Sequence, residues 1–392
     1  MGRSTARRPR ITGPSILIPS VLVAISVNYL HTEPVWTLED FRAAASGLGH
    51  HPQDHGWRDL YRLFSYGLNR SAPNLTTLTL AEARARPALS ATHLITLLGI
   101  ALKIIASDSF DTIAIDGPMD VRLHALESIL DRHRDLISTI VRTRQNSFTS
   151  VRRFLVPQVI LSSYFSSLNG CQAVFADFGT GLGVLPRQLN SRHQYNTFAN
   201  DLIWPDGIPT FRTIPLASRL GVDKGPLPDL DWVHACYGRS EYYTNLYDEL
   251  LRTLHTPDVS TTNVQYEKLD LLDIEALGAF IHQHKINAAN FSYVLYELES
   301  GMRTKIVEAL VRELHPPGVL IVAEPHRELQ GQGTVVELFH NGDVTPRTLC
   351  FVSDGHYKGY VIPLDDYESF ARSFPIIYEP KEVENSSNET SN

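Results

Sequence analysis

The 392-residue chain is poor in cysteine and has no excess of basic charge. Its three cysteines, Cys171, Cys236 and Cys350, are widely separated and form neither a CxxC pair nor a Cys/His cluster at metal-site spacing. This pattern predicts a reduced, cytoplasmic protein without a metal centre. Acidic residues outnumber basic ones by 43 to 35, giving a formal net charge of −8, which does not favour nucleic acid as a partner.

The sequence also lacks an apolar run long enough to cross a membrane. The best candidate, from Ile16 to Val27, is shorter than the ~20 residues that a span needs, and Pro19 interrupts it. Four arginines before it give residues 1–32 the outline of a signal peptide, but no small-x-small cleavage site follows. We therefore expect no membrane span, and we expect the polar tail 381–392 to be disordered.

Residues 33–155 have a helical pattern and predict an N-terminal helical domain. The segment that starts at Thr37 has the composition of a capped helix, and Leu94, Leu97 and Leu98 recur at helical spacing. A single long helix is predicted from Asp120 to Val141, with one apolar stripe and one charged face.

Residues 156–380 have the pattern of an α/β domain. Short apolar runs alternate with amphipathic stretches, which favours a Rossmann-like, mostly parallel sheet with helices on both faces. A helix stopped by Pro316 and Pro317 is predicted between the last two strands. The five predicted strands are Ala173–Asp177, Tyr195–Asp201, Val264–Asp270, Asn290–Leu295 and Gly318–Ala323.

A glycine-rich turn follows the first predicted strand. Asp177 ends the strand, and Gly179, Gly181 and Gly183 alternate after it, so a ligand can approach the backbone where no Cβ intervenes. A dinucleotide fingerprint would read GxGxxG, whereas Val184 occupies the sixth position here. The spacing of the three glycines therefore does not favour a nicotinamide cofactor.

An acid two residues before GxGxG resembles motif I of the class I S-adenosylmethionine-dependent methyltransferases. The resemblance extends over about residues 170–330 and includes the predicted fourth strand, its helix and the fifth strand. In its sequence pattern the chain is similar to methyltransferase-like proteins of mitoribosome assembly and to an uncharacterised bacterial group. It lacks the cysteine cluster of the mitoribosome-assembly proteins. The resemblance implies S-adenosyl-L-methionine as cofactor, with its methionine part against the glycines.

The same resemblance implies the cofactor-binding residues. Asp201, at the end of the second predicted strand, would accept hydrogen bonds from the ribose hydroxyls. Asp270 would contact the adenine amino group, with Asp273 as an alternative that could instead cap a helix. Upstream, Arg144 and Gln145 would close over the cofactor's carboxylate. The full predicted set is Asp177, Gly179, Thr180, Gly181, Gly183, Asp201, Asp270, Leu271, Ser292, Arg144 and Gln145.

Candidates for catalysis lie after the fourth and fifth strands, because ligands bind at the carboxyl edge of open sheets. Ser292, Tyr296 and Glu297 follow the fourth strand, and Glu324 and His326 follow the fifth. The predicted catalytic residues are Tyr296, Glu324 and His326, of which His326 is a candidate general base. For Tyr296 and its neighbour Glu297, a helix start packed on the sheet is an equal alternative. The Pro- and Gly-rich link from Trp204 to Gly238, the core of a predicted lid over residues 205–238, would cover the substrate.

The sequence thus predicts an enzyme that transfers a methyl group to a small-molecule or protein acceptor. One alternative is a catalytically inactive methyltransferase fold that serves as a binding or assembly module, since Asn290 stands where many members have an aspartate. A nicotinamide-dependent oxidoreductase is a weaker alternative.

Overall fold

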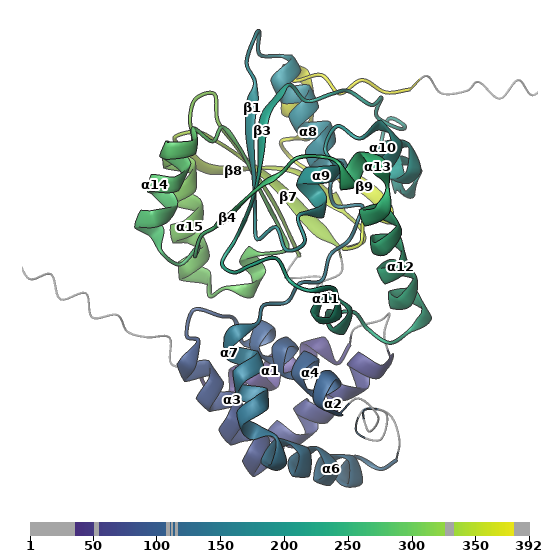
Figure 1. Ribbon diagram of the computed structural model, residues 1–392, viewed down its shortest axis with the longest axis vertical. Coiled ribbons are helices and arrows are strands. Elements are labelled where there is room, and N and C mark those ends of the chain that lie inside the picture. The colour runs from purple at the N-terminus through teal and green to yellow at the C-terminus, as the bar shows by residue number, and fades with distance from the viewer. Residues whose placement is uncertain are drawn as a thin grey trace, which may run out of the picture. The chain divides into compact units, whose positions relative to one another are not determined.

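The computed structural model in Figure 1 describes residues 36–50, 55–106, 110, 113, 117–325 and 333–379. The N-terminal segment 1–32 and the tail 381–392 lie outside these residues. Within the described part of the chain, no helix is both long and apolar enough to span a membrane.

The described part of the chain begins with helices at Leu38. Thr37 caps the first helix with a capping box, in which its side chain accepts from the amide of Asp40 and the Asp40 carboxylate accepts from the amide of Thr37. The single long helix predicted from Asp120 to Val141 is wrong, because the chain leaves helical geometry at His133 and starts a second helix. The helices are α1 (Leu38–Leu48), α2 (His55–Asn69), α3 (Pro73–Ala85), α4 (Ala91–Ala106), α6 (Met119–Arg132), α7 (Arg134–Thr143) and α8 (Leu155–Ser166).

Among the described residues after α8, nine strands form one sheet, and helices lie between them in the sequence. Five strands pair in parallel in the order β6-β5-β1-β3-β4, and their bounds are β1 (Ala173–Phe178), β3 (Leu216–Asp223), β4 (Gln265–Lys268), β5 (Ala288–Ser292) and β6 (Val319–Pro325). The sheet then continues with antiparallel pairs through β7 (Thr334–His340), β8 (Asp343–Val352) and β9 (Gly359–Pro363). The short β2 (Leu202–Ile203) pairs in parallel with β9. The sheet is therefore mixed, and the prediction of a mostly parallel sheet is wrong because short connections fold the C-terminal strands back as neighbours.

Four of the five predicted strands are present, as β1, β4, β5 and β6. The predicted strand from Tyr195 to Asp201 is wrong. Ser191 caps helix α10 (Arg192–Phe198) by accepting from the amide of Gln194, and the 3₁₀ helix η2 (Ala199–Asp201) follows. The strand beside β1 is instead β3, which lies within the segment predicted to be a lid.

Helices cover both faces of the sheet, as predicted (Figure 1). Phe178 and Phe291 face the core that contains α14 (Ile274–His284) and α15 (Ser300–Glu313), whereas the neighbouring strand residues Phe175 and Ala288 face the other core. That second face is covered by α8, α9 (Val184–Gln188), α10 and α12 (Glu241–His255). Alternate strand residues thus enter opposite cores, as the pleat requires.

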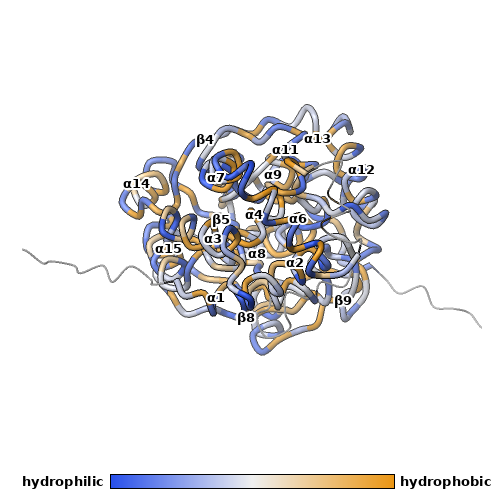
Figure 2. The backbone as a smooth tube through the Cα atoms, turned by 90° about the horizontal axis from the view of Figure 1, so that it is seen from below, coloured by the Kyte–Doolittle hydropathy of each residue, from blue (hydrophilic) through white to orange (hydrophobic). Residues whose placement is uncertain are grey.

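The N-terminal helices and the sheet share one hydrophobic core. Figure 2 shows hydrophobic stretches around α4, a helix in which 11 of 16 residues are buried, and its apolar residues share a core with Phe178 and Phe291 of the sheet. The amide of Ser90 donates to the carbonyl of Glu297, and the amide of Glu299 donates to the carbonyl of Ala88. The link between α3 and α4 is therefore fixed against the loop that follows β5, which contains η3 (Leu295–Glu297). The other short helices are α11 (Leu230–Cys236), α13 (Pro257–Ser260) and α16 (Tyr367–Ser373).

Candidate functional site

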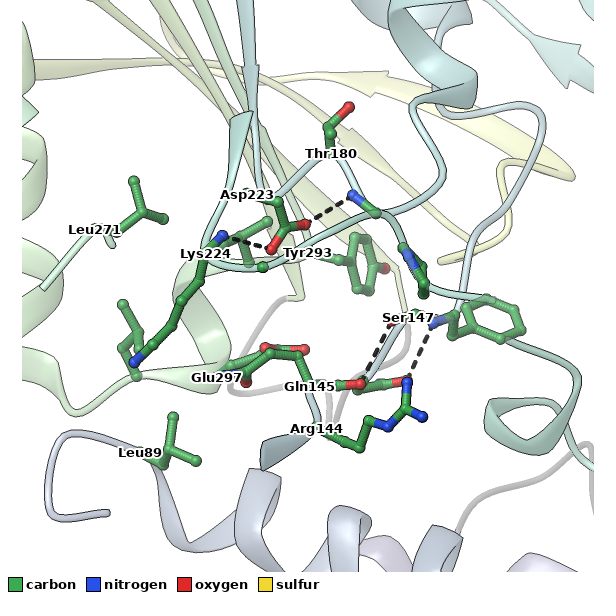
Figure 3. Close-up of a pocket in the computed structure, with 18 of the residues that line it drawn as sticks. Leu89, Arg144, Gln145, Ser147, Thr180, Asp223, Lys224, Leu271, Tyr293 and Glu297 are labelled. Carbon is green, nitrogen blue, oxygen red and sulfur yellow. Dashed lines mark hydrogen bonds between the residues drawn. The ribbon is translucent and has the colours of Figure 1, made fainter. Parts of the chain in front are cut away.

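A cavity of about 930 Å³ lies at the carboxyl ends of the parallel strands. The strand order reverses between β1 and β5, and open α/β sheets bind ligands at such a switch point. Its walls come from the turn after β1, the loops after β3, β4 and β5, the α3–α4 link and the segment that joins α7 to α8. Figure 3 shows side chains from these loops facing one another across the cavity.

The glycine turn after β1 has left-handed backbone geometry. Gly179 and Gly183 have φ of +69° and +66°, and a Cβ on them would collide with the side chains of Val294 and Tyr266 respectively. A Cβ on Gly181 would meet only the hydroxyl of Thr149, at 3.8 Å, so this glycine borders open space in the cavity. Two glycines therefore allow the turn to pack, and the third leaves room beside the backbone.

Asp177 is the penultimate residue of β1 and lies on the cavity wall. Its carboxylate accepts hydrogen bonds from the Thr180 hydroxyl and the Asn290 amide, each at 2.8 Å. Burial nevertheless raises the pKa of Asp177 to about 6. Asn290 is itself buried in β5, and its amide donates a hydrogen bond where a second acid would repel the Asp177 carboxylate.

Asp223, the last residue of β3, is hydrogen-bonded to the backbone of the glycine turn. Its carboxylate accepts from the amides of Gly181, at 3.0 Å, and Lys224, at 2.7 Å (Figure 3). Burial raises its pKa. The sequence analysis missed this residue, although it follows the apolar Val222 at the end of β3.

Asp201 occupies a different place from the one predicted. Its carboxylate accepts from Nε of Arg152 at 2.6 Å, and the same guanidinium binds Glu249. Asp201 does not belong to the cavity wall, because the element that ends there is helical and does not neighbour β1. The assignment of the strand-end acid to Asp201 is therefore corrected to Asp223.

Asp270 and Leu271 follow β4 and line the cavity, as predicted. Nζ of Lys224 lies 2.8 Å from the Asp270 carboxylate, which links the loops after β3 and β4. Asp273 instead caps α14 by accepting from the amide of Ala276. The structure thus separates the two acids that the sequence left as alternatives.

Arg144 and Gln145 lie on the wall that precedes α8. The Arg144 guanidinium is 3.2 Å from the Asp229 carboxylate and 5.1 Å from the Trp232 ring centroid, and the Gln145 carbonyl accepts from the Trp232 indole. Ser292 lines the same cavity. These residues join the segment before α8 to the start of α11.

Arg153 is a further cationic residue on the wall. It is 8% exposed, its guanidinium lies 3.7 Å from the centroid of the Tyr293 ring, and its Nε has no hydrogen-bond partner among the described residues. The nearby Arg142 and Arg152 are paired with Glu82 and Glu249. A buried guanidinium with an unused donor has capacity for an anionic group.

Glu324 and Tyr296, two of the predicted catalytic residues, do not form part of the cavity wall. The Glu324 carboxylate accepts from the amides of Val294, Leu295 and Tyr296, at 2.9 to 3.0 Å, which fixes the loop after β5. Burial raises its pKa to about 7. The third candidate, His326, lies outside the described residues.

Glu297, from the same loop, does line the cavity. Its carboxylate lies 3.4 Å from Nδ1 of His93, which is fully buried in α4. Burial, then the nearby Glu324 and Asp223 carboxylates, raise the pKa of Glu297 well above its usual range. Burial lowers the pKa of His93 to about 3, so this histidine is neutral at physiological pH.

The cavity therefore brings together most of the predicted cofactor-binding residues. On its wall are Asp177, Gly179, Thr180, Gly181, Asp270, Leu271, Ser292, Arg144 and Gln145, whereas Gly183 begins α9 behind it. Within the segment predicted to be a lid, only residues between Asp223 and Trp232 line the cavity. Strand β3 (Leu216–Asp223) belongs to the same segment and is part of the sheet.

No family model matches the chain, and no curated protein sequence matches it. Among solved structures, it resembles an O-methyltransferase family protein from Burkholderia thailandensis (13% identity, TM-score 0.26), with 60% of this chain and 54% of that chain covered. It also resembles MycE methyltransferase from the mycinamycin biosynthetic pathway, in complex with Mg and SAH (10% identity, TM-score 0.25, 67% and 65% covered). The chain thus spans about half of the first relative's length. At these identities and TM-scores the likeness does not define a function, which we infer below from the residues of the pocket.

Proposed function

We propose that the chain is an S-adenosyl-L-methionine-dependent methyltransferase and that the cavity binds this cofactor. The observation that supports it best is the Asp223 carboxylate, which accepts from the Gly181 amide and so joins a strand-end acid to the glycine turn. A carboxylate has about four acceptor positions, and the amides of Gly181, Lys224 and Gly225 leave Asp223 with capacity to accept from the ribose hydroxyls.

The donor set of the cavity fits the other parts of this cofactor. Gly181 leaves the backbone open for the methionine part, and Asp270 with Leu271 offers an acceptor and an apolar surface to adenine. Arg144 and Arg153 supply cationic donors for its carboxylate. Asp177 can interact with its ammonium group, since a cation favours the charged form of a carboxyl whose pKa burial has raised.

The protein's own contribution is binding and orientation. Bound S-adenosyl-L-methionine supplies an electrophilic methyl group on a sulfonium, and in-line transfer needs alignment and exclusion of water. The cavity is bounded by the α3–α4 link on one side and by the glycine turn on the other, which restricts the position of an acceptor. Glu324 and Tyr296 act as positioning residues, because they hold the loop that carries Ser292 and Glu297.

The acceptor is a small molecule or a protein side chain. The cavity, at about 930 Å³, is in the range of ligand pockets for small molecules. The net charge of −8 does not favour a nucleic acid.

Isothermal titration with S-adenosyl-L-methionine and S-adenosylhomocysteine tests the proposal. The wild-type protein should bind both, and Asp223→Asn should weaken binding at least tenfold because a carboxylate is a stronger acceptor than an amide. Asp201→Asn is the matched control and should bind like wild type, since Asp201 lies off the cavity wall. Absence of binding by the folded wild-type protein, or a larger loss in Asp201→Asn than in Asp223→Asn, would contradict the proposal.

A further inference from the structure

Glu297 differs from the other acids of the cavity wall because its carboxyl has neither a hydrogen-bond donor nor a lysine or arginine partner among the described residues. Asp177 accepts from Thr180 and Asn290, and Asp223 accepts from backbone amides. Asp229 and Asp270 are paired with Arg144 and Lys224. For Glu297, the described residues offer only the 3.4 Å approach of His93. Its side chain is 13% exposed, and Figure 3 shows it across the cavity from Thr180 and Asp223.

The surroundings of Glu297 favour its neutral form when the cavity holds only water. Burial disfavours the charge, and no cation compensates it fully. Arg86 is occupied with the carbonyls of Val141 and Arg144, and the His93 ring is neutral. The groups with an electrostatic effect on this carboxyl are Glu324, Asp223, Arg86 and Arg153.

We infer that Glu297 lets this pocket distinguish a cationic methyl donor from its uncharged demethylated product. The inference rests on the proposed function. When the donor enters, its sulfonium favours the charged carboxylate, so Glu297 gives up its proton to water. After methyl transfer the sulfonium has become a thioether, the carboxylate has lost its compensating charge, and it takes a proton back. The product is then held less tightly than the donor.

The dimensions of the cavity give the size of the change that a bound cation causes in the proton affinity of Glu297. If a cavity of 930 Å³ is treated as a sphere it is about 12 Å across, so a bound cation lies within about 12 Å of Glu297, which lines the cavity. At an effective dielectric constant of about 20, a unit charge at that distance changes the proton affinity of a carboxyl about tenfold. The donor's affinity should therefore increase with pH relative to that of the product.

The test is titration of the full chain with S-adenosyl-L-methionine and with S-adenosylhomocysteine, in buffers of different ionisation enthalpy, to count protons released. The amino group common to both ligands titrates in both experiments and cancels in their difference. Wild type should release more protons with the cationic ligand. Glu297→Gln should remove that excess and lower the affinity ratio of the two ligands about tenfold.

Two further variants keep the experiment decisive. Glu297→Asp retains a carboxyl and should retain the excess proton release. Glu267→Gln, in β4 and away from the cavity wall, is the matched control and should behave like wild type. Equal proton release with both ligands in wild type, or an excess that survives Glu297→Gln, would overturn the inference while leaving cofactor binding intact. Failure of both ligands to bind would instead refute the proposed function, and this inference with it.

Discussion

Replacement of Asp177 by asparagine should stabilise the protein at high pH. Asparagine is nearly isosteric, its carbonyl can accept from Asn290, and its amide can donate to the Thr180 hydroxyl. The wild-type carboxyl has its pKa raised from 3.8 to about 6 by burial. Its charged form is therefore a cost to the folded state that the amide does not incur.

Proton linkage gives the sign and the size of the expected difference in the free energy of unfolding between the two proteins. Between pH 3.8 and about 6 the folded protein holds a proton on Asp177 that the unfolded chain has lost, so raising the pH through this window destabilises the fold. The shift corresponds to up to about 3 kcal/mol, all of it present above pH 6 and absent below pH 3.8. Asp177→Asn should therefore be more stable than wild type by up to about 3 kcal/mol at pH 8 and equally stable at pH 4.

Urea denaturation of both proteins between pH 4 and 8, followed by tryptophan fluorescence, measures this difference. Groups that are not coupled to Asp177 titrate equally in both proteins, so the difference reports on Asp177 and on its electrostatic coupling to Asp223. A difference that does not change with pH, or an asparagine variant that is less stable at pH 8, would refute the reasoning. The same variant should bind S-adenosyl-L-methionine more weakly, because an acid retained at a cost in stability is expected at a functional site.

Three more predictions concern packing and the cavity. Gly183→Ala should destabilise the fold by about 2 kcal/mol, because φ is +66° and the new Cβ meets Tyr266; the Tyr266→Ala background should recover part of this loss in denaturant titrations. Phe291→Ala should lower the free energy of unfolding by about 3–5 kcal/mol, whereas Tyr360→Ala, at a residue 59% exposed, should change it by less than about 0.5 kcal/mol. S-adenosylhomocysteine should change the fluorescence of Trp232, which lines the cavity, and Trp232→Phe should remove that change; an unchanged signal in the variant would place the ligand elsewhere.

The parts of the fold that the sequence predicted have strong local signals. In β1 the buried run ends at an acid followed by alternating glycines, and in the β5–α15–β6 unit the periodicity changes clearly from strand to helix and back. Asp177, Gly179, Thr180 and Gly181, which depend on these elements, line the cavity, and their contacts to a cofactor stay a prediction. The non-helical stretch between α7 and α8 supplies Arg144 and Gln145.

The second strand was misplaced because two segments compete for that position. Residues 195–201 include the apolar Tyr195 and Phe198 and end in an acid, as a buried strand can, but the cap at Ser191 starts a helix there. The true strand, β3, is exposed over its first half and contains Arg219, so its apolar signal is short. Asp223 was missed for that reason, and the antiparallel strands after β6 were missed because their pairing depends on tertiary contacts.

The most direct test of the central claim is a crystal structure of the protein grown with S-adenosylhomocysteine. The account predicts that the ribose hydroxyls lie within hydrogen-bonding distance of the Asp223 carboxylate and that the amino acid part follows the glycine turn at Gly181. Ligand bound at Asp201, or at any site away from this turn, would contradict it.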